Sequence, residues 1–401
     1  MPADSRNSYR RAISIGSGIR ARCRWISDDR TDRTARRLAR TRRAASWPHH
    51  VLRHDRARRP RRGASHRGQR DHRLGRGDRP RGPYWSEETA ESVLAVLDRY
   101  LFPRVTGIGV HAGAATAFRQ VRGNPFAKCA FDIALTDLRA RVLGIPVAAL
   151  WGEHSPMPVP LSWSLAGTSV RQDVTEAVAK RALGYGIFKL KVGALPLRQD
   201  LDRVRAVREA LGTAVSLRVD ANQGWTRADV GVAMRELTEL DVAFVEQPVP
   251  SADTVGMVAL QNAGNVPIAA DESLRTVADA TALAEADAAR VFVYKLAKHG
   301  GFTPARNVAA VADAHAVAGY LGCMIESSIG TAAYLAFAAS GVGLQFGCEL
   351  FGPQLLVDDM TKEPVEYSPG YVHPPAGPGL GVEVDEAKVA AMAVAHVRAG
   401  R

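Results

Sequence analysis

Five short apolar runs between residues 188 and 301 each end in charged residues, and they decide the fold. They read Phe188-Lys-Leu-Lys-Val-Gly193, Val219-Asp-Ala-Asn222, Val245-Glu-Gln-Pro248, Ala270-Asp-Glu-Ser273 and Tyr294-Lys-Leu-Ala-Lys-His-Gly-Gly301. Similar strand-like runs occur at 161–165, 321–325 and 343–346, with helical segments such as 170–183 and 200–211 between them. Eight strands that alternate with helices predict an α/β fold of the (β/α)7β barrel type, known as the TIM barrel.

The charged residues at the strand ends recur at regular intervals. They are Lys191, Asp220, Glu246, Asp271, Lys295 and Glu326, and 24 to 31 residues separate neighbours. Since each interval holds one strand and one helix, all six should lie at the C-terminal mouth of the barrel. Barrel enzymes place their catalytic residues at that mouth.

Three of these residues are carboxylates, namely Asp220, Glu246 and Asp271. A single Asp after a strand is usually the cap of the next helix. Three carboxylates crowded into one mouth would repel one another strongly without a cation. Carboxylate oxygens suit a hard divalent ion, so the three residues are predicted to bind Mg²⁺ or Mn²⁺.

The lysines acquire a role once a metal site is expected. Lys189 and Lys191 alternate along a strand and therefore share one face, while Lys295 should approach from the opposite side of the barrel. A neighbouring ammonium lowers the pKa of a lysine, so Lys189 is expected to prepare Lys191 for proton transfer near neutral pH. A cation facing lysines suits proton transfer at the carbon α to a carboxylate.

The remaining composition excludes several classes of protein. No run of about 18 apolar residues predicts a membrane span, so no membrane partner is expected. The cysteines Cys23, Cys129, Cys323 and Cys348 lie far apart, which argues against a disulfide framework or a zinc ribbon. With no secretory pattern at the start, these features predict a cytoplasmic protein.

The net charge of +12 is distributed unevenly. Residues 1–83 hold 25 Arg and 7 Asp but neither Lys nor Glu, and the rest of the chain carries a net charge of −6. A nucleic-acid-binding arm on an inert barrel is one interpretation, although such arms usually mix Lys with Arg and carry aromatic residues. A disordered tail is another. The third interpretation is that residues 1–83 come from a segment of a GC-rich gene read out of frame. We expect this third interpretation to hold, and we expect no nucleic-acid partner.

The five motifs, in this order, resemble those of the enolase superfamily, in its muconate lactonizing enzyme subgroup. The resemblance covers about residue 82 to the C-terminus. A lysine at position 295, and no histidine on the seventh strand, favour this subgroup over mandelate-racemase relatives. Five further stretches resemble muconate and chloromuconate cycloisomerases: Gly82-Pro-Tyr-Trp-Ser86, Trp163-Ser-Leu-Ala-Gly-Thr168, Ile325-Glu-Ser-Ser-Ile-Gly-Thr331, Glu349-Leu-Phe-Gly-Pro353 and Gly377-Pro-Gly-Leu-Gly381.

The resemblance implies an isomerase that converts cis,cis-muconate or chloromuconate to muconolactone in aromatic catabolism. One substrate carboxylate would add across the distal double bond, giving an enolate held by Mn²⁺ or Mg²⁺. Lys191 would protonate this enolate, and Lys295 would stabilise its charge from the opposite face. Acylamino-acid racemases and o-succinylbenzoate synthases of the same subgroup share this set of residues and remain alternatives.

The resemblance also assigns supporting roles. Glu326 would orient the substrate, while Asn222 and Glu272 would support the site from behind. Lys298 is expected to be structural or solvated. The expected partners are a small dicarboxylate substrate and further copies of the chain in a homo-oligomer.

Members of the family carry an α+β capping domain whose loops close over the barrel mouth. The boundaries expected here are 1–82 for the Arg-rich segment, 83–158 for the rest of the cap and a linker, 159–353 for the catalytic barrel, and 354–401 for a C-terminal segment packed back on both. Residues 1–82 do not match a cap, so the cap is expected to be incomplete or out of frame. A one-base offset across 73–82 can restore a stretch typical of the family, Gly-Trp-Gly-Glu-Val-Thr-Val-Pro-Gly.

Overall fold

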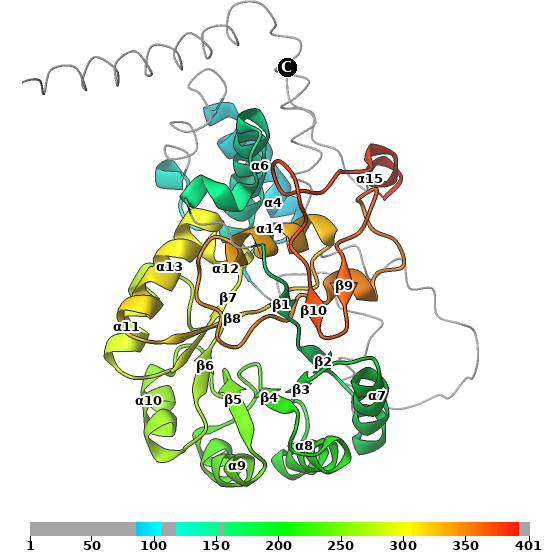
Figure 1. Ribbon diagram of the computed structural model, residues 1–401. Helices are drawn as coiled ribbons and strands as arrows, with labels where there is room; N and C mark the ends of the chain where they lie inside the picture. Colours follow the sequence, from blue (N-terminus) through cyan, green and yellow to red (C-terminus); the bar gives the residue numbers. More distant parts are fainter. Residues whose placement is uncertain (1–85, 106–117, 153–155, 168, 393–401) are drawn as a thin grey trace, which may run out of the picture.

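The computed structural model describes residues 86–105, 118–152, 156–167 and 169–392, so the expectations for residues 1–82 lie outside the described part. Seven parallel strands form one curled sheet in the order β2 to β8 (Figure 1). The strands are β2 (Trp163–Leu165), β3 (Ile187–Lys191), β4 (Ser216–Asp220), β5 (Val242–Glu246), β6 (Ile268–Ala270), β7 (Val291–Tyr294) and β8 (Ala318–Leu321). The predicted parallel α/β architecture is confirmed.

Helices cover the outer face of this sheet (Figure 1). They are α7 (Val170–Ala182), α8 (Leu197–Leu211), α9 (Arg227–Glu239), α10 (Thr254–Ala263), α11 (Val277–Glu285), α12 (Leu296–His299), α13 (Phe302–Ala314) and α14 (Ser328–Ala338). Their apolar residues and the strands form one large buried core. A smaller cluster around Phe244, Val293 and Tyr320 packs separately from it. None of the helices in the described ranges combines the length and apolarity needed to span a membrane.

The last two strands differ from the prediction. The run expected at 321–325 is a strand over 318–321, and the run expected at 343–346 forms no strand. Residues 346–349 nevertheless form backbone hydrogen bonds with the chain on either side of them. Cys348 N–H donates to the Pro160 carbonyl (2.8 Å), and Glu349 N–H donates to the Leu321 carbonyl of β8 (2.9 Å). Gly347 has a φ of 67°, which breaks the extended backbone that a regular strand requires. A short irregular segment therefore joins β8 to the residues before β2.

The amino-terminal part of the described chain is helical and lies at one end of the sheet (Figure 1). It comprises α4 (Ala90–Val96), η1 (Leu97–Leu101), η2 (Phe102–Arg104), α6 (Pro125–Leu143) and η3 (Val147–Trp151). Val93, Leu101 and Phe131 belong to its own apolar cluster. The buried Glu88 carboxylate accepts the N–H groups of Phe126 (2.7 Å) and Ala127 (3.1 Å), which satisfies the free donors at the start of α6.

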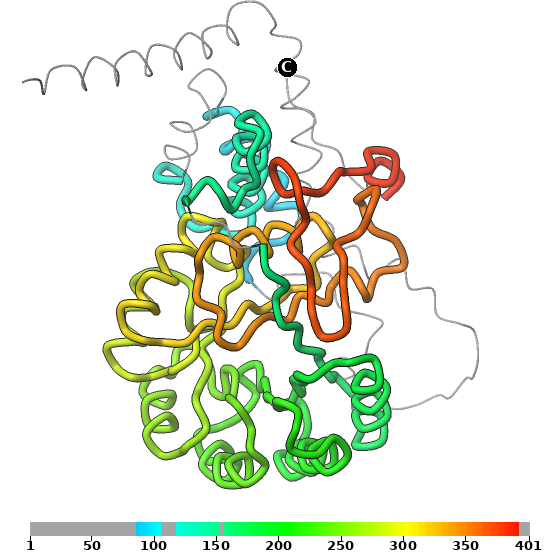
Figure 2. Tube along the Cα trace, in the orientation of Figure 1, coloured from blue at the N-terminus to red at the C-terminus, as the bar shows by residue number. Residues whose placement is uncertain are grey.

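The C-terminal segment returns to the first helices, as the trace in Figure 2 shows. It contains η4 (Gly352–Leu355), β9 (Tyr367–Ser368), β10 (Tyr371–Val372) and α15 (Glu386–Met392). Strand β10 pairs with β9 and with β1 (Val159–Pro160) in a small antiparallel sheet. Gly379 N–H donates to Ile145 (2.9 Å), and Arg141 donates to the Val382 carbonyl (2.8 Å), so this segment packs on the end of α6.

A buried carboxylate joins α6 to the helices around the sheet. Asp132 of α6 accepts the N–H of Phe302 (2.7 Å), the first residue of α13. The backbone approaches so closely that a side chain at Gly301 would collide with Asp132. Burial raises the pKa of Asp132 to about 7, because the charged form loses its hydration there.

Asp132→Asn should make the protein more stable at pH 8 and leave its stability near pH 4 almost unchanged. The amide still accepts the Phe302 N–H, but it cannot carry the buried charge. An unfolded Asp titrates near 4, so the stability of the unaltered protein falls as the pH rises from about 4 through 7. The gain is a few kcal/mol at most, since one pKa unit corresponds to about 1.4 kcal/mol.

Chemical denaturation at pH 4 and pH 8 measures this difference. Asp137→Asn on the same helix is the control, because Asp137 pairs with Arg141 (2.8 Å) and its charge is compensated. That variant should gain no stability at pH 8. Equal effects of Asp132→Asn at both pH values would contradict the prediction.

Candidate active site

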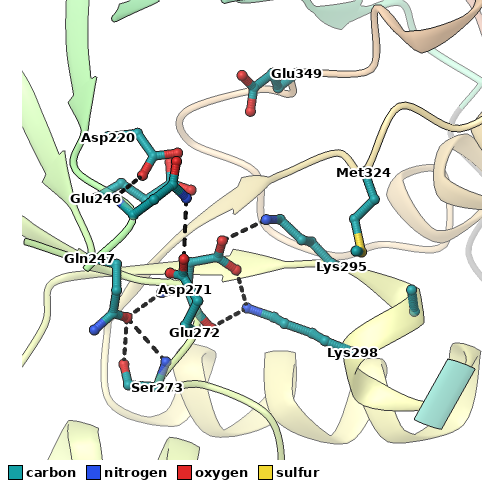
Figure 3. Close-up of polar contacts among 12 residues, drawn as sticks. Asp220, Glu246, Gln247, Asp271, Glu272, Ser273, Lys295, Lys298, Met324 and Glu349 are labelled. Atoms are coloured by element: carbon teal, nitrogen blue, oxygen red, sulfur yellow. Dashed lines mark hydrogen bonds and ion pairs between the residues drawn. The ribbon is translucent and has the colours of Figure 1, made fainter. Parts of the chain in front are cut away.

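Three buried carboxylates lie at the C-terminal ends of neighbouring strands. Asp220 ends β4, Glu246 ends β5 directly beside it, and Asp271 follows β6. None of the three is more than 2% exposed. Figure 3 shows Asp220 and Glu246 together on one side of Asp271. The structure thus brings together the three residues that the sequence predicts as metal ligands.

Lys189 lies among the carboxylates. Its Nζ is 2.8 Å from Glu246 Oε2, 2.5 Å from Glu349 Oε2 and 3.4 Å from Asp220 Oδ2. The side chain is only 1% exposed. Its ammonium group therefore links the ends of β4 and β5 to the segment that follows β8.

Lys191 and Lys295 come from opposite sides of the curled sheet, on β3 and directly after β7. Lys191 forms an ion pair with Asp220 and donates to Asn222 Oδ1 (3.2 Å). Lys295 pairs with Asp271 Oδ2 (2.5 Å), and Figure 3 shows it reaching Asp271 from the side opposite to Asp220. The Lys191 side chain is 33% exposed, against 10% for Lys295, so Lys191 is the more accessible of the two ammonium groups.

The pKa of Lys191 corrects one expectation from the sequence. Burial and the nearby Lys189 both lower it, as expected, but the carboxylates of Asp220, Glu349 and Glu246 together outweigh them, so the pKa lies above its ordinary value. The expected tuning toward neutral pH is therefore not present in the chain by itself. A second cation that neutralised Asp220 would leave burial and Lys189 to lower the pKa of Lys191 toward neutrality.

The Glu246 carboxylate is buried in surroundings that disfavour its charge, and a cation would relieve this. Burial, together with Asp220 and Asp271, raises the pKa of Glu246 to about 8. Among the described residues, Glu246 Oε1 has no hydrogen-bond partner. Three acidic side chains with a free buried oxygen match the oxygen ligands that Mg²⁺ and Mn²⁺ prefer. The residues present therefore fit a hard divalent cation.

The ammonium groups stand between the carboxylates in this structure. In the described ranges no three His, Cys, Asp or Glu side chains are gathered as tightly as ion ligands are. Lys191, Lys189 and Lys295 each hold one carboxylate oxygen, at Asp220, Glu246 and Asp271 respectively. Ligation of a cation therefore requires these side chains to turn away from their lysine partners.

Asn222 and Glu272 lie directly behind the carboxylates. The backbone N–H of Asn222 donates to Asp220 Oδ1 (3.0 Å), and its side-chain amide donates to Glu272 Oε1 (3.2 Å). Burial and the charge of Asp271 raise the pKa of Glu272 to about 7. The two side chains connect the loops after β4 and β6.

Glu326 lies deeper than its predicted role requires. It is fully buried, and its Oε1 accepts the N–H of Met324 (2.7 Å). Burial raises its pKa to about 7, and the nearby ammonium of Lys295 opposes this rise. Its contacts are with the loop after β8 and with Tyr334, rather than with the three carboxylates.

The sequence interpretation missed two charged residues that contact this centre. Glu349 pairs with Lys189, and it follows Glu326 by 23 residues, close to the spacing of the other strand ends. Lys298 was expected to be structural or solvated, and its contacts are structural: it donates to Asp271 Oδ1 (2.7 Å) and to the Asp271 carbonyl (2.7 Å). Its position three residues after Lys295, on the same face of a helical turn, was the available signal.

Gln247 is a third residue that the sequence interpretation missed. Its side-chain oxygen accepts the N–H groups of Asp271 (3.1 Å) and Ser273 (3.1 Å) and the Ser273 hydroxyl (2.9 Å). Its Nε2 donates to the Val249 carbonyl (3.0 Å). Figure 3 shows the contacts of Gln247 with Asp271 and Ser273, at the start of the loop that carries Asp271. Gln247 therefore fixes one predicted ligand relative to its neighbour on β5.

Comparisons with known proteins agree with this geometry. Residues 172–388 match the family described as enolase C-terminal domain-like, and residues 75–152 match the mandelate racemase / muconate lactonizing enzyme N-terminal domain. The chain is 38% identical to a chloromuconate cycloisomerase of Cupriavidus necator over 79% of this chain and 86% of the relative. It is also 38% identical to muconate cycloisomerase 1 of Rhodococcus opacus over 78% of this chain and 84% of the relative.

A solved structure shows the same relationship. The muconate lactonizing enzyme from Pseudomonas putida superposes with a TM-score of 0.75 at 35% identity, covering 78% of this chain and 87% of that one. The carboxylates at the strand ends, the lysines that face them and the matches to both domain families thus indicate the same family. The chain belongs to the enolase superfamily, in the muconate lactonizing enzyme subgroup.

Proposed function

We propose that this protein is a divalent-metal-dependent cycloisomerase that converts cis,cis-muconate or a chloromuconate to the corresponding lactone. The observation that carries the proposal is the pairing of three buried carboxylates with lysines from opposite sides of one mouth. The likeness to cycloisomerases over more than three quarters of the chain supports it. We propose further that it acts in the cytoplasm as a homo-oligomer.

The reaction needs one new bond and one proton. A carboxylate oxygen of the substrate attacks the distal double bond, and negative charge develops on the carbon α to the other carboxylate. Transfer of one proton from an ammonium group to that carbon completes the lactone and leaves a neutral amine. The amine regains its proton from solvent, so the dianionic substrate becomes a monoanionic product.

Asp220, Glu246 and Asp271 would hold a Mg²⁺ or Mn²⁺ ion. When bound, the ion neutralises a substrate carboxylate and lowers the cost of charge on the adjacent carbon. Lys191 is the proposed proton donor, because its side chain is the more exposed of the two opposed lysines. Lys295, buried on the other side, supplies a fixed positive charge toward the same carbon.

Other polar and charged residues support the proposed metal ligands and lysines. Lys189 stays in contact with Glu246 and Glu349, and it therefore balances charge rather than transferring a proton. Asn222 and Glu272 hold the loops behind the carboxylates. Glu326 lies beneath the site, so the orienting role proposed for it would act through the loop after β8.

Loss of cis,cis-muconate absorbance tests the function directly. We expect turnover with Mn²⁺ or Mg²⁺, loss of that turnover with a chelator, and recovery when the cation is restored. The physical reason is that three buried carboxylates cannot accommodate a further substrate carboxylate without a neutralising cation.

Turnover that persists in full after chelation would contradict the metal dependence. If the chain does not convert cis,cis-muconate but converts an N-acylamino acid or an o-succinylbenzoate precursor, it catalyses another reaction of the subgroup. If this chain is inactive, a version with residues 73–82 rebuilt in the offset frame tests whether the Arg-rich segment, residues 1–82, prevents activity.

A further inference from the structure

Arg203 lies at a junction of buried charges just outside the mouth. It projects from α8 toward the ends of β2 and β3, and it is only 3% exposed. Its three nitrogen atoms have three different acceptors: Asp173 Oδ2 (2.6 Å), Asp200 Oδ1 (2.9 Å) and the carbonyl oxygen of Lys191 (3.0 Å). The planar guanidinium spreads its donors over three nitrogen atoms in a fixed plane, whereas a lysine has its three donors on one nitrogen atom and cannot reproduce this spread.

The two carboxylates that Arg203 contacts also accept backbone N–H groups, one from each of two turns. The other oxygen of Asp173 accepts the N–H of Gly167 (2.9 Å), directly after β2. The other oxygen of Asp200 accepts the N–H of Gly193 (2.7 Å), directly after β3. Helices α7 and α8, which carry Asp173 and Arg203, lie side by side over these strands (Figure 1).

Both turns are packed too closely for any residue but glycine. A side chain at Gly167 would collide with Asp173 Oδ1. Gly193 has a φ of 85°, and a side chain there would collide with the Ala221 carbonyl in the loop after β4. The position of Lys191 is therefore constrained by its own carbonyl and by the turn two residues later.

We propose that Arg203 is a positioning residue that fixes the backbone of Lys191 and the two adjoining turns in the geometry that proton transfer requires. The inference rests on the proposed function, because it takes Lys191 as the proton donor. A proton crosses only between atoms held within hydrogen-bond reach, so a small displacement of the Lys191 backbone lowers the rate. Arg203 itself touches no reacting atom.

The same helix provides a matched control. Arg208 also lies on α8 and is buried, at 7% exposed. It donates to four carbonyl oxygens, those of Leu240, Gly212, Val215 and Asp241. Those residues precede β4 and β5, at the end of the sheet opposite to the site. One helix thus carries two buried arginines, one holding the mouth and the other holding the far end.

The test compares Arg203→Lys with Arg208→Lys in the full chain. Both changes keep the charge and lose the planar arrangement of donors on three nitrogen atoms, so both should lower the melting temperature to a similar extent. We expect kcat for cis,cis-muconate with Mn²⁺ to fall about 10- to 100-fold in Arg203→Lys. In Arg208→Lys it should stay within about twofold of the unaltered chain, since no contact near the mouth changes.

Hydrogen exchange gives a second readout that does not need activity. Peptides containing Gly167 and Gly193 should exchange their amide hydrogens about tenfold faster or more in Arg203→Lys and at the unaltered rate in Arg208→Lys. Equal exchange in the two variants would overturn the proposal, whether or not muconate is the substrate. Equal kcat values in an active protein would overturn it as well. Absence of turnover in the unaltered chain would instead count against the proposed function.

Discussion

Lys191→Ala should convert cis,cis-muconate at least about 100-fold more slowly than the unaltered chain, because a positioned general acid contributes roughly 10²- to 10⁴-fold. The variant should still bind the divalent cation, since all three carboxylates remain. Removal of the lysine also frees Asp220 from the closer of its two ion pairs, so Mn²⁺ affinity should rise rather than fall. Steady-state kinetics and a Mn²⁺ titration measure the two effects separately.

The control is Lys388→Ala. Lys388 is a half-buried lysine of α15 that pairs with Asp358 at 3.0 Å, and neither residue is among those of the mouth. That variant should keep its full kcat. If Lys191→Ala kept it too, Lys191 would not be the proton donor, and Lys295 would take its place as the candidate.

Glu246→Gln should lower the affinity for Mn²⁺ by more than about tenfold and lower turnover with it, because even residues behind metal ligands contribute about 10- to 100-fold. Glu246 is fully buried, with one oxygen free for a ligand and the other held by Lys189. The amide keeps the shape of the side chain and can still accept from Lys189. The variant therefore removes a negative charge with little change in packing.

Glu236→Gln tests whether a carboxylate elsewhere has the same effect. Glu236 lies on α9, where it pairs with Arg198 (3.0 Å) and Arg205 (2.5 Å) on the outer surface. It should leave both Mn²⁺ affinity and turnover unchanged. Undiminished Mn²⁺ affinity in Glu246→Gln would remove this residue from the proposed ligands.

The residues of the candidate centre could be found from the sequence because a parallel sheet repeats a simple rule. Each strand and helix pair returns the chain to the same edge, so charged residues at successive strand ends must meet. Asp220, Glu246 and Asp271 came together for this reason, as did Lys191 and Lys295 on the opposite sides. No packing detail was needed to place them at one mouth.

Other parts depended on where the backbone bends. Residues 343–346 have the composition of a strand, but the pairing occurs at 346–349, on both sides of a turn at Gly347. That shift explains why Glu349 was missed as a contact of Lys189. Gln247 was missed for a similar reason, since its three contacts reach a loop that begins 24 residues later.

The sequence by itself determined that the three carboxylates and the two opposed lysines gather at the mouth, because the spacing of strand ends is a local property of the chain. Only the tertiary structure decided their charge states and their supports. Asp220 raises the pKa of Lys191 despite Lys189, and Arg203 links Asp173, Asp200 and the Lys191 backbone. Both effects depend on distances of a few ångströms between residues remote in sequence, and no periodicity of the chain encodes such distances.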